Sequence, residues 1–141
     1  MSDNNIPEGF VPLDRNSPFS DLTGPYYEIR DENGKHQVLG VRLRFEHLNK
    51  LRVAHGGTMM TIADNAFGDA ILAHFGEPVS FVTVSFSCEF LAAGKEGDWV
   101  EGRVTINRAG RRLIFAKCAL TIEGKNVFNA SGVFSVVEKK A

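Results

Sequence analysis

Residues 49–73, NKLRVAHGGTMMTIADNAFGDAILA, decide the fold because they predict the longest helix of the chain. From Gly56 to Phe75, apolar side chains recur at helical spacing, and the Gly-Glu-Pro sequence that follows is typical of a helix end. The apolar positions cover more than a narrow stripe, which indicates a helix largely wrapped by protein. One acid, Asp64, lies within this apolar segment, where a carboxylate needs a specific role.

Gly56 and Gly57 open this helix directly after His55. The first N–H groups of a helix have no partner within it, and glycine lets a ligand approach them closely. These donors, together with the positive end of the helix dipole, stabilise an oxygen that gains negative charge. An oxyanion site combined with the Asp64 carboxylate indicates acyl-transfer chemistry. The alternative interpretation is a tight turn before a helix, with a solvated or interface aspartate.

The sequence on either side of the helix predicts strands, because apolar and polar residues alternate there. A hairpin over 25–31 and 36–45 precedes the helix, and a loop over 46–54 leads into it. Four strands are expected to follow as a meander, over 80–92, 98–108, 113–122 and 127–137. Short connections favour antiparallel pairing, and the helix is the large element available to cover the sheet. We expect an α+β fold with one antiparallel sheet wrapped around one long central helix.

The chain of 141 residues is long enough for one domain with a sizeable core. We expect that domain over residues 25–138, after an extended lead-in over residues 1–24 that contains three prolines. The net charge of −1 gives no general surface for nucleic acid. The first residues lack a signal-peptide pattern and no apolar run is long enough for a membrane span, so we expect no membrane association and a cytoplasmic location. Cys88 and Cys118 lack metal-ligand spacing and are expected to be buried free thiols.

The helix start reads HGGTMMTIAD, with Asp64 nine residues after His55, and the strand after the helix reads VTVSFSCEFLAA. Together with the predicted layout, these motifs resemble the hotdog-fold acyl-CoA thioesterases, and most closely their phenylacetic-acid-degradation (PaaI) type. The resemblance covers about residues 25 to 138. It implies hydrolysis of an acyl-CoA thioester to a free acid and CoA, with no metal and no cofactor other than the CoA of the substrate.

The resemblance also implies roles for individual residues. The Gly57 N–H polarises the thioester carbonyl, and Asp64 acts as general base on water or as nucleophile. Asn49 helps to hold the carbonyl or the water, Thr83 orients the attacking water, and His55 shapes the loop and reaches the thioester region. Taken without the resemblance, Asn49 could be a turn residue and Thr83 a β-branched strand residue.

Gly57 and Asp64 are seven residues apart, so they lie on nearly the same helix face, roughly 10 Å apart along the axis. An aspartate side chain is too short to reach a carbonyl held at Gly57. If both act on one thioester, they come from two subunits, which predicts a homodimer with two equivalent sites at its interface. The resemblance implies the same arrangement, with dimers that pair into tetramers.

Further residues are candidates for substrate contacts. Gly56 and Met60 lie on the helix side of the expected acyl pocket. The basic cluster Arg108, Arg111 and Arg112 falls at a predicted hairpin, where it is either a solvated face or a contact for the CoA phosphates. The apolar residues near the pocket suit aryl or medium- to long-chain acyl groups and do not separate these classes.

Two other functions are compatible with parts of this pattern. A hotdog hydratase or dehydratase pairs a catalytic histidine with an acid near the α and β carbons of the acyl group, and the sequence shows no such signature. A non-catalytic hotdog protein that binds acyl-CoA is the main alternative. Such a binder has no need for the Asp64 carboxylate close to a thioester.

Overall fold

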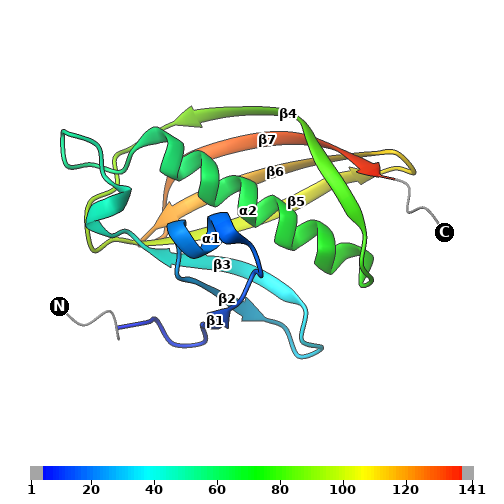
Figure 1. Cartoon of the computed structure of the whole chain (residues 1–141), viewed down its shortest axis with the longest axis horizontal. Helices are drawn as coiled ribbons and strands as arrows, with labels where there is room; N and C mark the ends of the chain where they lie inside the picture. The colour runs from blue at the N-terminus through cyan, green and yellow to red at the C-terminus, as the bar shows by residue number, and fades with distance from the viewer. Residues whose placement is uncertain (1–4, 138–141) are drawn as a thin grey trace.

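The long helix of the structure, α2 (Gly56–Phe75), has the bounds that the sequence predicts. Figure 1 shows the computed structural model, which describes residues 5–137; residues 1–4 and 138–141, including the last position of the expected domain, lie outside the described part. One face of α2 is buried, and Gly76 ends the helix in a left-handed conformation with a φ of 69°. The buried residues are Met59, Ile62, Ala63, Ala66, Phe67 and Ile71.

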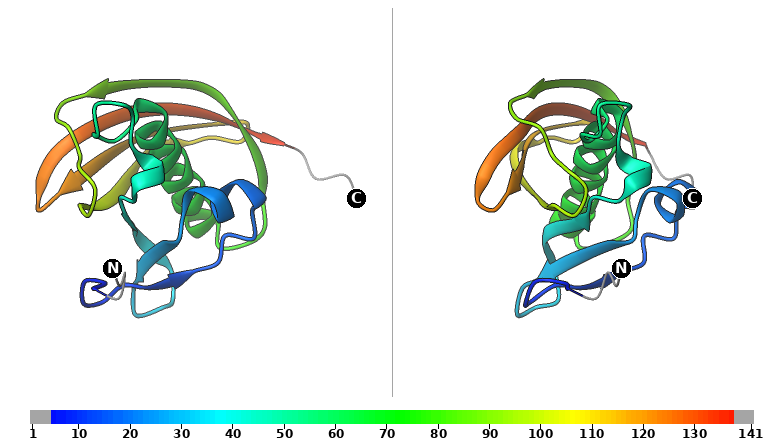
Figure 2. Two further views of the ribbon diagram at one scale, coloured as in Figure 1. Left: turned by 60° about the vertical axis from the view of Figure 1, so that its left-hand side comes forward. Right: turned by 90° about the vertical axis from the view of Figure 1, so that its left-hand side faces the viewer.

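A seven-stranded antiparallel sheet curls around α2 (Figures 1 and 2). Its strands are β1 (Val11–Leu13), β2 (Tyr26–Arg30), β3 (His36–Arg42), β4 (Ser80–Phe90), β5 (Trp99–Ala109), β6 (Leu113–Ile122) and β7 (Lys125–Val137). Two short helices, α1 (Pro18–Thr23) and the 3-10 helix η1 (Phe45–His47), precede α2 in the chain. This arrangement confirms the predicted α+β fold.

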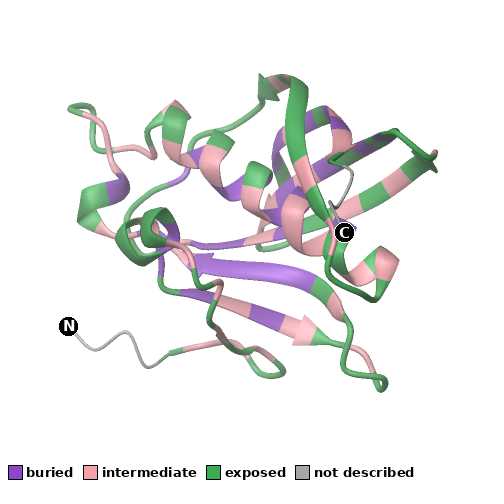
Figure 3. Ribbon diagram, turned by 45° about the vertical axis from the view of Figure 1, so that its right-hand side comes forward, coloured by how far each residue is buried: buried purple, intermediate pink, exposed green. Residues whose placement is uncertain are grey.

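The sheet leaves one side of α2 open, as the alternation of colours along the helix shows in Figure 3. Met60 and Leu72 are 40% and 44% exposed, and Asp64 between them is also exposed. Asp64 follows Met60 by four residues and precedes Leu72 by eight, so the three side chains lie along the side of the helix that does not face the sheet. The prediction of a largely wrapped helix therefore holds for the sheet side of α2, whereas this line remains uncovered in the single protomer.

The strand order in the sheet is β1-β2-β3-β5-β6-β7-β4, so the predicted four-strand meander is wrong for β4. β5, β6 and β7 do form a meander. β4 pairs with β7 alone among the strands of residues 5–137, and it stands at the sheet edge opposite β1. Alternation along each strand predicts where a strand lies in the sequence but does not determine which strand it pairs with.

A β-bulge in β4 changes which side chains face α2. The register with β7 shifts between Thr83 and Ser85, which makes Val84 the extra residue of the bulge. An extra residue reverses the alternation of faces, so Phe81 before the bulge and Phe86 after it both pack against the core. Strict alternation would put Val82 on the same face as Phe86, but Val82 is 55% exposed.

The lead-in over residues 1–24 is not extended throughout. Ser17 caps α1 by accepting a hydrogen bond from the Ser20 N–H, and Pro18 occupies the first position of the helix. β1 pairs with β2 and adds an edge strand to the sheet. Phe10 packs edge-on against Trp99, with the ring centroids 5.0 Å apart. Part of the lead-in therefore packs as part of the folded body.

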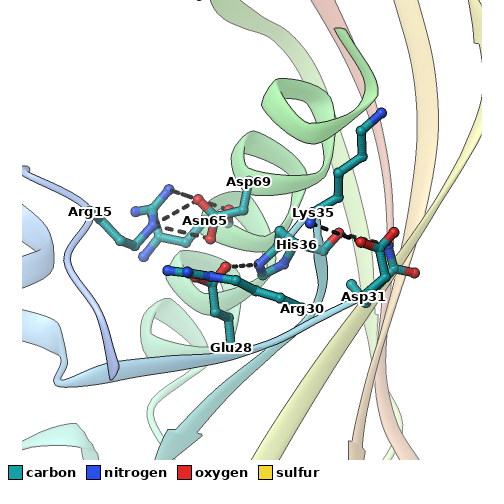
Figure 4. Close-up of polar contacts among 9 residues, drawn as sticks. Arg15, Glu28, Arg30, Asp31, Lys35, His36, Asn65 and Asp69 are labelled. Carbon is teal, nitrogen blue, oxygen red and sulfur yellow. Dashed lines mark hydrogen bonds and ion pairs between the residues drawn. The ribbon is translucent and has the colours of Figure 1, made fainter. Parts of the chain in front are cut away.

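Partly buried ion pairs join the lead-in to α2 and connect the strands of the β2–β3 hairpin to each other (Figure 4). Arg15 lies 3.0 Å from the Asp69 carboxylate on α2. Glu28, which is 4% exposed, accepts a hydrogen bond from Arg30 Nε at 2.6 Å and lies 2.8 Å from His36 Nδ1. Burial raises the pKa of Asp69, and the charge of Arg15 opposes this rise. Loss of one partner would leave a buried charge unpaired, which is strongly destabilising.

The two cysteines are free thiols, as predicted, although their burial differs. Cys118 is buried and Cys88 is half-buried. Burial raises the pKa of Cys118 to about 12, which leaves almost no thiolate at neutral pH.

His47 joins the end of α1 to the loop before α2. Its Nδ1 accepts a hydrogen bond from the Arg44 N–H at 2.8 Å, so the ring proton is on Nε2, which donates to the Thr23 carbonyl at 2.6 Å. His47 is 4% exposed, and burial lowers its pKa below the ordinary 6.5. Its carbonyl accepts a hydrogen bond from the His55 N–H at 2.9 Å, which connects these contacts to the start of α2.

We expect protonation of His47 to destabilise the fold in mild acid. Because its pKa is lowered in the folded state, the unfolded chain takes up the proton first as the pH falls below 6.5. The contribution of this group to the free energy of unfolding is therefore complete above that pH and is lost below it. In His47→Gln, which has no ring to protonate, this part of the pH dependence disappears. Urea unfolding midpoints between about pH 7 and about pH 5 measure the difference.

The exposed His74 at the end of α2 provides the control for this measurement. His74→Gln should keep the pH dependence of the wild type. An equal loss of stability on acidification in the wild type and in His47→Gln would contradict the assignment.

Candidate functional site

At the start of α2, the backbone N–H groups of Gly56 and Gly57 differ in their hydrogen bonding. His55 caps the helix, and its Nδ1 accepts a hydrogen bond from the Gly57 N–H at 2.8 Å. The Gly56 N–H has no hydrogen-bond partner among the described residues. The Gly57 N–H, which the family resemblance implies as the oxyanion donor, is thus occupied in this protomer, whereas the Gly56 N–H is available to a ligand oxygen.

Gly56 lies against the end of β4. A side chain at this position would place its Cβ 3.1 Å from the Phe90 ring, closer than an ordinary contact. Gly56 also lines a cavity of about 260 Å³ together with Met59, Phe90 and Gly94. The absence of a side chain therefore keeps open the approach to the first turn of α2.

The loop before α2 is shaped by the side chain of Asn49. Its Oδ1 accepts hydrogen bonds from the N–H groups of Leu51 and Val53, at 2.9 and 3.3 Å. Ala54 then bonds through its N–H to the Gly94 carbonyl at 2.8 Å. In this protomer the side-chain oxygen of Asn49 therefore accepts hydrogen bonds within the turn. Through these bonds Asn49 holds the loop that leads to His55.

Asp64 and Thr83 meet across the gap between α2 and β4. Thr83 Oγ1 donates a hydrogen bond to Asp64 Oδ1 at 3.2 Å, and both residues are exposed in the single protomer. Thr83 lies just before the bulge at Val84, so the bulge lets Thr83 and Phe86 line the same space. Two of the predicted site residues, nineteen positions apart in the sequence, are therefore adjacent in the fold.

Asp64 and Thr83 open into a cavity of about 350 Å³ between α1, α2 and β4. Its remaining lining residues are Phe19, Met60, Thr61, Asn65 and Phe86. Met60 was predicted at the acyl pocket, and the cavity places it beside Asp64. Phe19 was not predicted as a site residue. The Ser-Pro pair before it signals a helix start, but nothing local in the sequence indicates that this helix lies over α2.

The helix start and Asp64 do not share a cavity within one protomer. Gly56 lines the smaller cavity at the first turn of α2, and Asp64 lines the larger one two turns further along. This separation agrees with the distance of roughly 10 Å that the helix geometry predicts between the first turn and Asp64.

The candidate CoA contacts lie elsewhere. The hairpin arginines are Arg108, Arg111 and Arg112, and all three are exposed. The Arg112 carbonyl accepts a hydrogen bond from the Val136 N–H, close to the start of β4. Gly56 lies against Phe90 at the other end of β4. Within one protomer the structure therefore does not bring these arginines to the start of α2.

Two classes of feature are absent from the described part of the chain. Within residues 5–137, no group of three or more His, Cys, Asp or Glu side chains is arranged to hold a metal ion. The helices of the same part are too short or too polar to cross a bilayer.

Comparison with known proteins places the chain in a family. The family model of the thioesterase superfamily matches residues 51–128, which is more than half of the chain. An esterase candidate of Pseudomonas aeruginosa is 37% identical over 130 residues, which cover 92% of this chain and 96% of that protein. The match to the family model includes the start of α2, Asp64 and Thr83.

Solved structures resemble the fold closely. A variant of the phenylacetic acid degradation protein PaaI from Thermus thermophilus has a TM-score of 0.74 and 24% sequence identity. The match covers 86% of this chain and 100% of the PaaI chain. A Streptococcus pneumoniae protein described as a hypothetical thioesterase, solved with coenzyme A, has a TM-score of 0.68 and 25% identity, covering 74% and 80%. These likenesses confirm the predicted hotdog fold. The chain therefore belongs to the thioesterase superfamily, as a hotdog protein of the thioester hydrolase class.

Proposed function

We propose that the protein hydrolyses an acyl-CoA thioester, with an aryl or aliphatic acyl group, to a free acid and CoA. The observation that carries the proposal is the Asp64–Thr83 hydrogen bond at the wall of a largely apolar cavity. A carboxylate beside an apolar cavity is suited to activate water next to a bound acyl group. The coenzyme A bound to the Streptococcus pneumoniae relative supports CoA as the carrier.

In the proposed reaction, Asp64 is the group that activates the attack. Thr83 occupies Oδ1, which leaves Oδ2 to accept a proton from water. The water oxygen attacks the carbonyl carbon, the C–S bond breaks as the tetrahedral intermediate collapses, and the proton held by Asp64 passes to the leaving thiolate. A route in which Asp64 attacks the carbonyl itself uses the same geometry. Neither route needs a metal or a cofactor, because a thiolate is a good leaving group.

The thioester oxygen is proposed to bind at the start of α2. The family resemblance implies the Gly57 N–H as the donor, but this N–H is bonded to His55 Nδ1. We therefore place the carbonyl oxygen at the Gly56 N–H, and assign to His55 and Gly57 the support of the first turn. Loss of an oxyanion donor typically lowers kcat by about 100- to 1,000-fold.

A second copy of the chain is proposed to complete each site through β4. This strand has eleven residues, ends the sheet, and exposes 55% of Val82 and 58% of Val84. A long apolar edge strand is a template for pairing with another strand, whereas β1 at the other edge is three residues long and contains Pro12. Two-fold pairing of β4 with its copy is antiparallel and sets the start of one strand beside the end of the other.

Such pairing would bring together the separated parts of the site. The end of β4 lies beside Gly56, and Thr83 near its start bonds Asp64. The partner's Asp64 would then approach the Gly56 N–H of this protomer, and the partner's Arg112 hairpin would approach the same end, where CoA phosphates need basic groups. Pairing of two dimers into a tetramer is proposed from the family resemblance. We expect a cytoplasmic location, because both cysteines are free thiols.

The alternative function is non-catalytic binding of acyl-CoA. Asp64→Asn distinguishes the two, since it keeps the size of the side chain and an acceptor oxygen but removes the base. We expect the wild type to release CoA from acyl-CoA substrates and Asp64→Asn to lose at least about 100-fold in kcat with little change in binding. Release is followed with a thiol reagent, corrected for the cysteines of the protein. Binding of acyl-CoA without release by the wild type would support the binder.

The Gly56 N–H can be removed without breaking the helix. Position 56 is the first residue of α2, where proline is tolerated, and His55 before it has the extended conformation that proline favours, with φ −63° and ψ 139°. We expect Gly56→Pro to lower kcat by about 100-fold or more. Gly56→Ala is the matched control, because it adds the same Cβ against Phe90 but keeps the N–H. If Gly56→Ala remains active and Gly56→Pro is equally active, this N–H is not the donor.

A further inference from the structure

The short helix α1 contributes one ring to the cavity beside Asp64. Phe19 lines this cavity although 58% of its surface is exposed. Leu22, one turn later on the same helix, is 75% exposed and does not line the cavity. A phenyl ring that is mostly exposed and still borders a cavity contributes little to the core, so its position is available for contact with a ligand.

Polar contacts at both ends hold α1 in place over α2. At its first turn, Arg15 Nη1 donates to Ser20 Oγ at 2.8 Å while the same guanidinium pairs with Asp69 of α2 at 3.0 Å (Figure 4). At its last turn, Arg44 donates to the carbonyls of Leu22 and Gly24, at 3.1 and 2.9 Å. These contacts are largely independent of Phe19, so the ring can be changed while the helix keeps its position.

The cavity has apolar walls from three separate elements. Phe19 comes from α1, Met60 from α2 and Phe86 from β4, while Asp64 and Thr83 stand on its polar side. Its volume of about 350 Å³ lies at the lower end of the range of about 300 to 1,000 Å³ for ligand pockets. An acyl group whose carbonyl carbon is attacked at Asp64 has its tail directed toward the apolar walls.

We propose that Phe19 sets the upper size limit of the acyl group, so that compact acyl groups fit and long straight chains meet the ring. This inference rests on the proposed thioesterase function, because it concerns the same site. Phe19 is assigned as a specificity-determining residue and Arg15 as a positioning residue that acts through α1.

The test compares Phe19→Ala, Phe19→Trp and Leu22→Ala with the wild type on a compact and a long-chain acyl-CoA. A change of one methylene in an apolar pocket alters kcat/KM by about 10- to 200-fold. We therefore expect Phe19→Ala to raise the long-to-compact ratio of kcat/KM by about tenfold or more. Phe19→Trp should lower the ratio, and Leu22→Ala should leave it unchanged. Unchanged ratios in both Phe19 variants would overturn the proposal.

A binding measurement separates this inference from the proposed function. S-alkyl-CoA thioethers cannot be hydrolysed, so their dissociation constants report the pocket without catalysis. A matching shift in relative affinity toward the long chain is expected for Phe19→Ala. If the wild type hydrolyses no acyl-CoA but this shift occurs, the thioesterase function fails and the size limit stands. If hydrolysis occurs and neither the kinetic nor the binding preference moves in Phe19→Ala, the size limit fails and the thioesterase function stands.

Discussion

The burial of one face of α2 against a single sheet determines where each candidate site residue lies. Phe67 and Ile71 are fully buried on this face, and they fix the rotation of the helix about its axis. Because the helix has 3.6 residues per turn, that rotation turns Met60 and Asp64 away from the centre of the sheet. Asp64 therefore lies between α2 and the edge strand β4, where Thr83 donates a hydrogen bond to it. This position of the carboxylate is the basis of the role proposed for Asp64.

The same constraint places the two parts of the proposed site in separate cavities of each protomer. The free Gly56 N–H opens into one cavity and Asp64 opens into another, and the distance between them follows from the rise of the helix. Within residues 5–137, β4 pairs on one side only, so its eleven residues present an edge beside both cavities. Two-fold pairing across this edge is the arrangement in which one thioester could meet both groups. In the proposed dimer, the pairing of the subunits and the assembly of each site both depend on this edge.

The sequence was sufficient for features that depend on local pattern. The bounds of α2 follow from its apolar spacing and from Gly76, and the strand positions follow from alternation. Pairing of β4 with β7, and the bulge at Val84, depend on contacts between distant segments and left no local signal. The position of Phe19 depends on Arg15 and Arg44 contacts with other elements. The state of the Gly57 N–H depends on the rotamer of His55, which a sequence does not specify.

Each site is proposed to combine Gly56 of one protomer with Asp64 of its partner, and subunit mixing tests this arrangement most directly. Asp64→Asn and Gly56→Pro chains are each inactive or nearly so as homodimers, but a mixed dimer would contain one intact site. Random assembly of equal amounts should restore about a quarter of the wild-type activity. Mixing the wild type with a chain that carries both changes should give no active mixed dimer. If the first mixture stays inactive while mixed dimers form, or if wild-type chains keep full activity beside the double variant, each site lies within one protomer and the account is wrong.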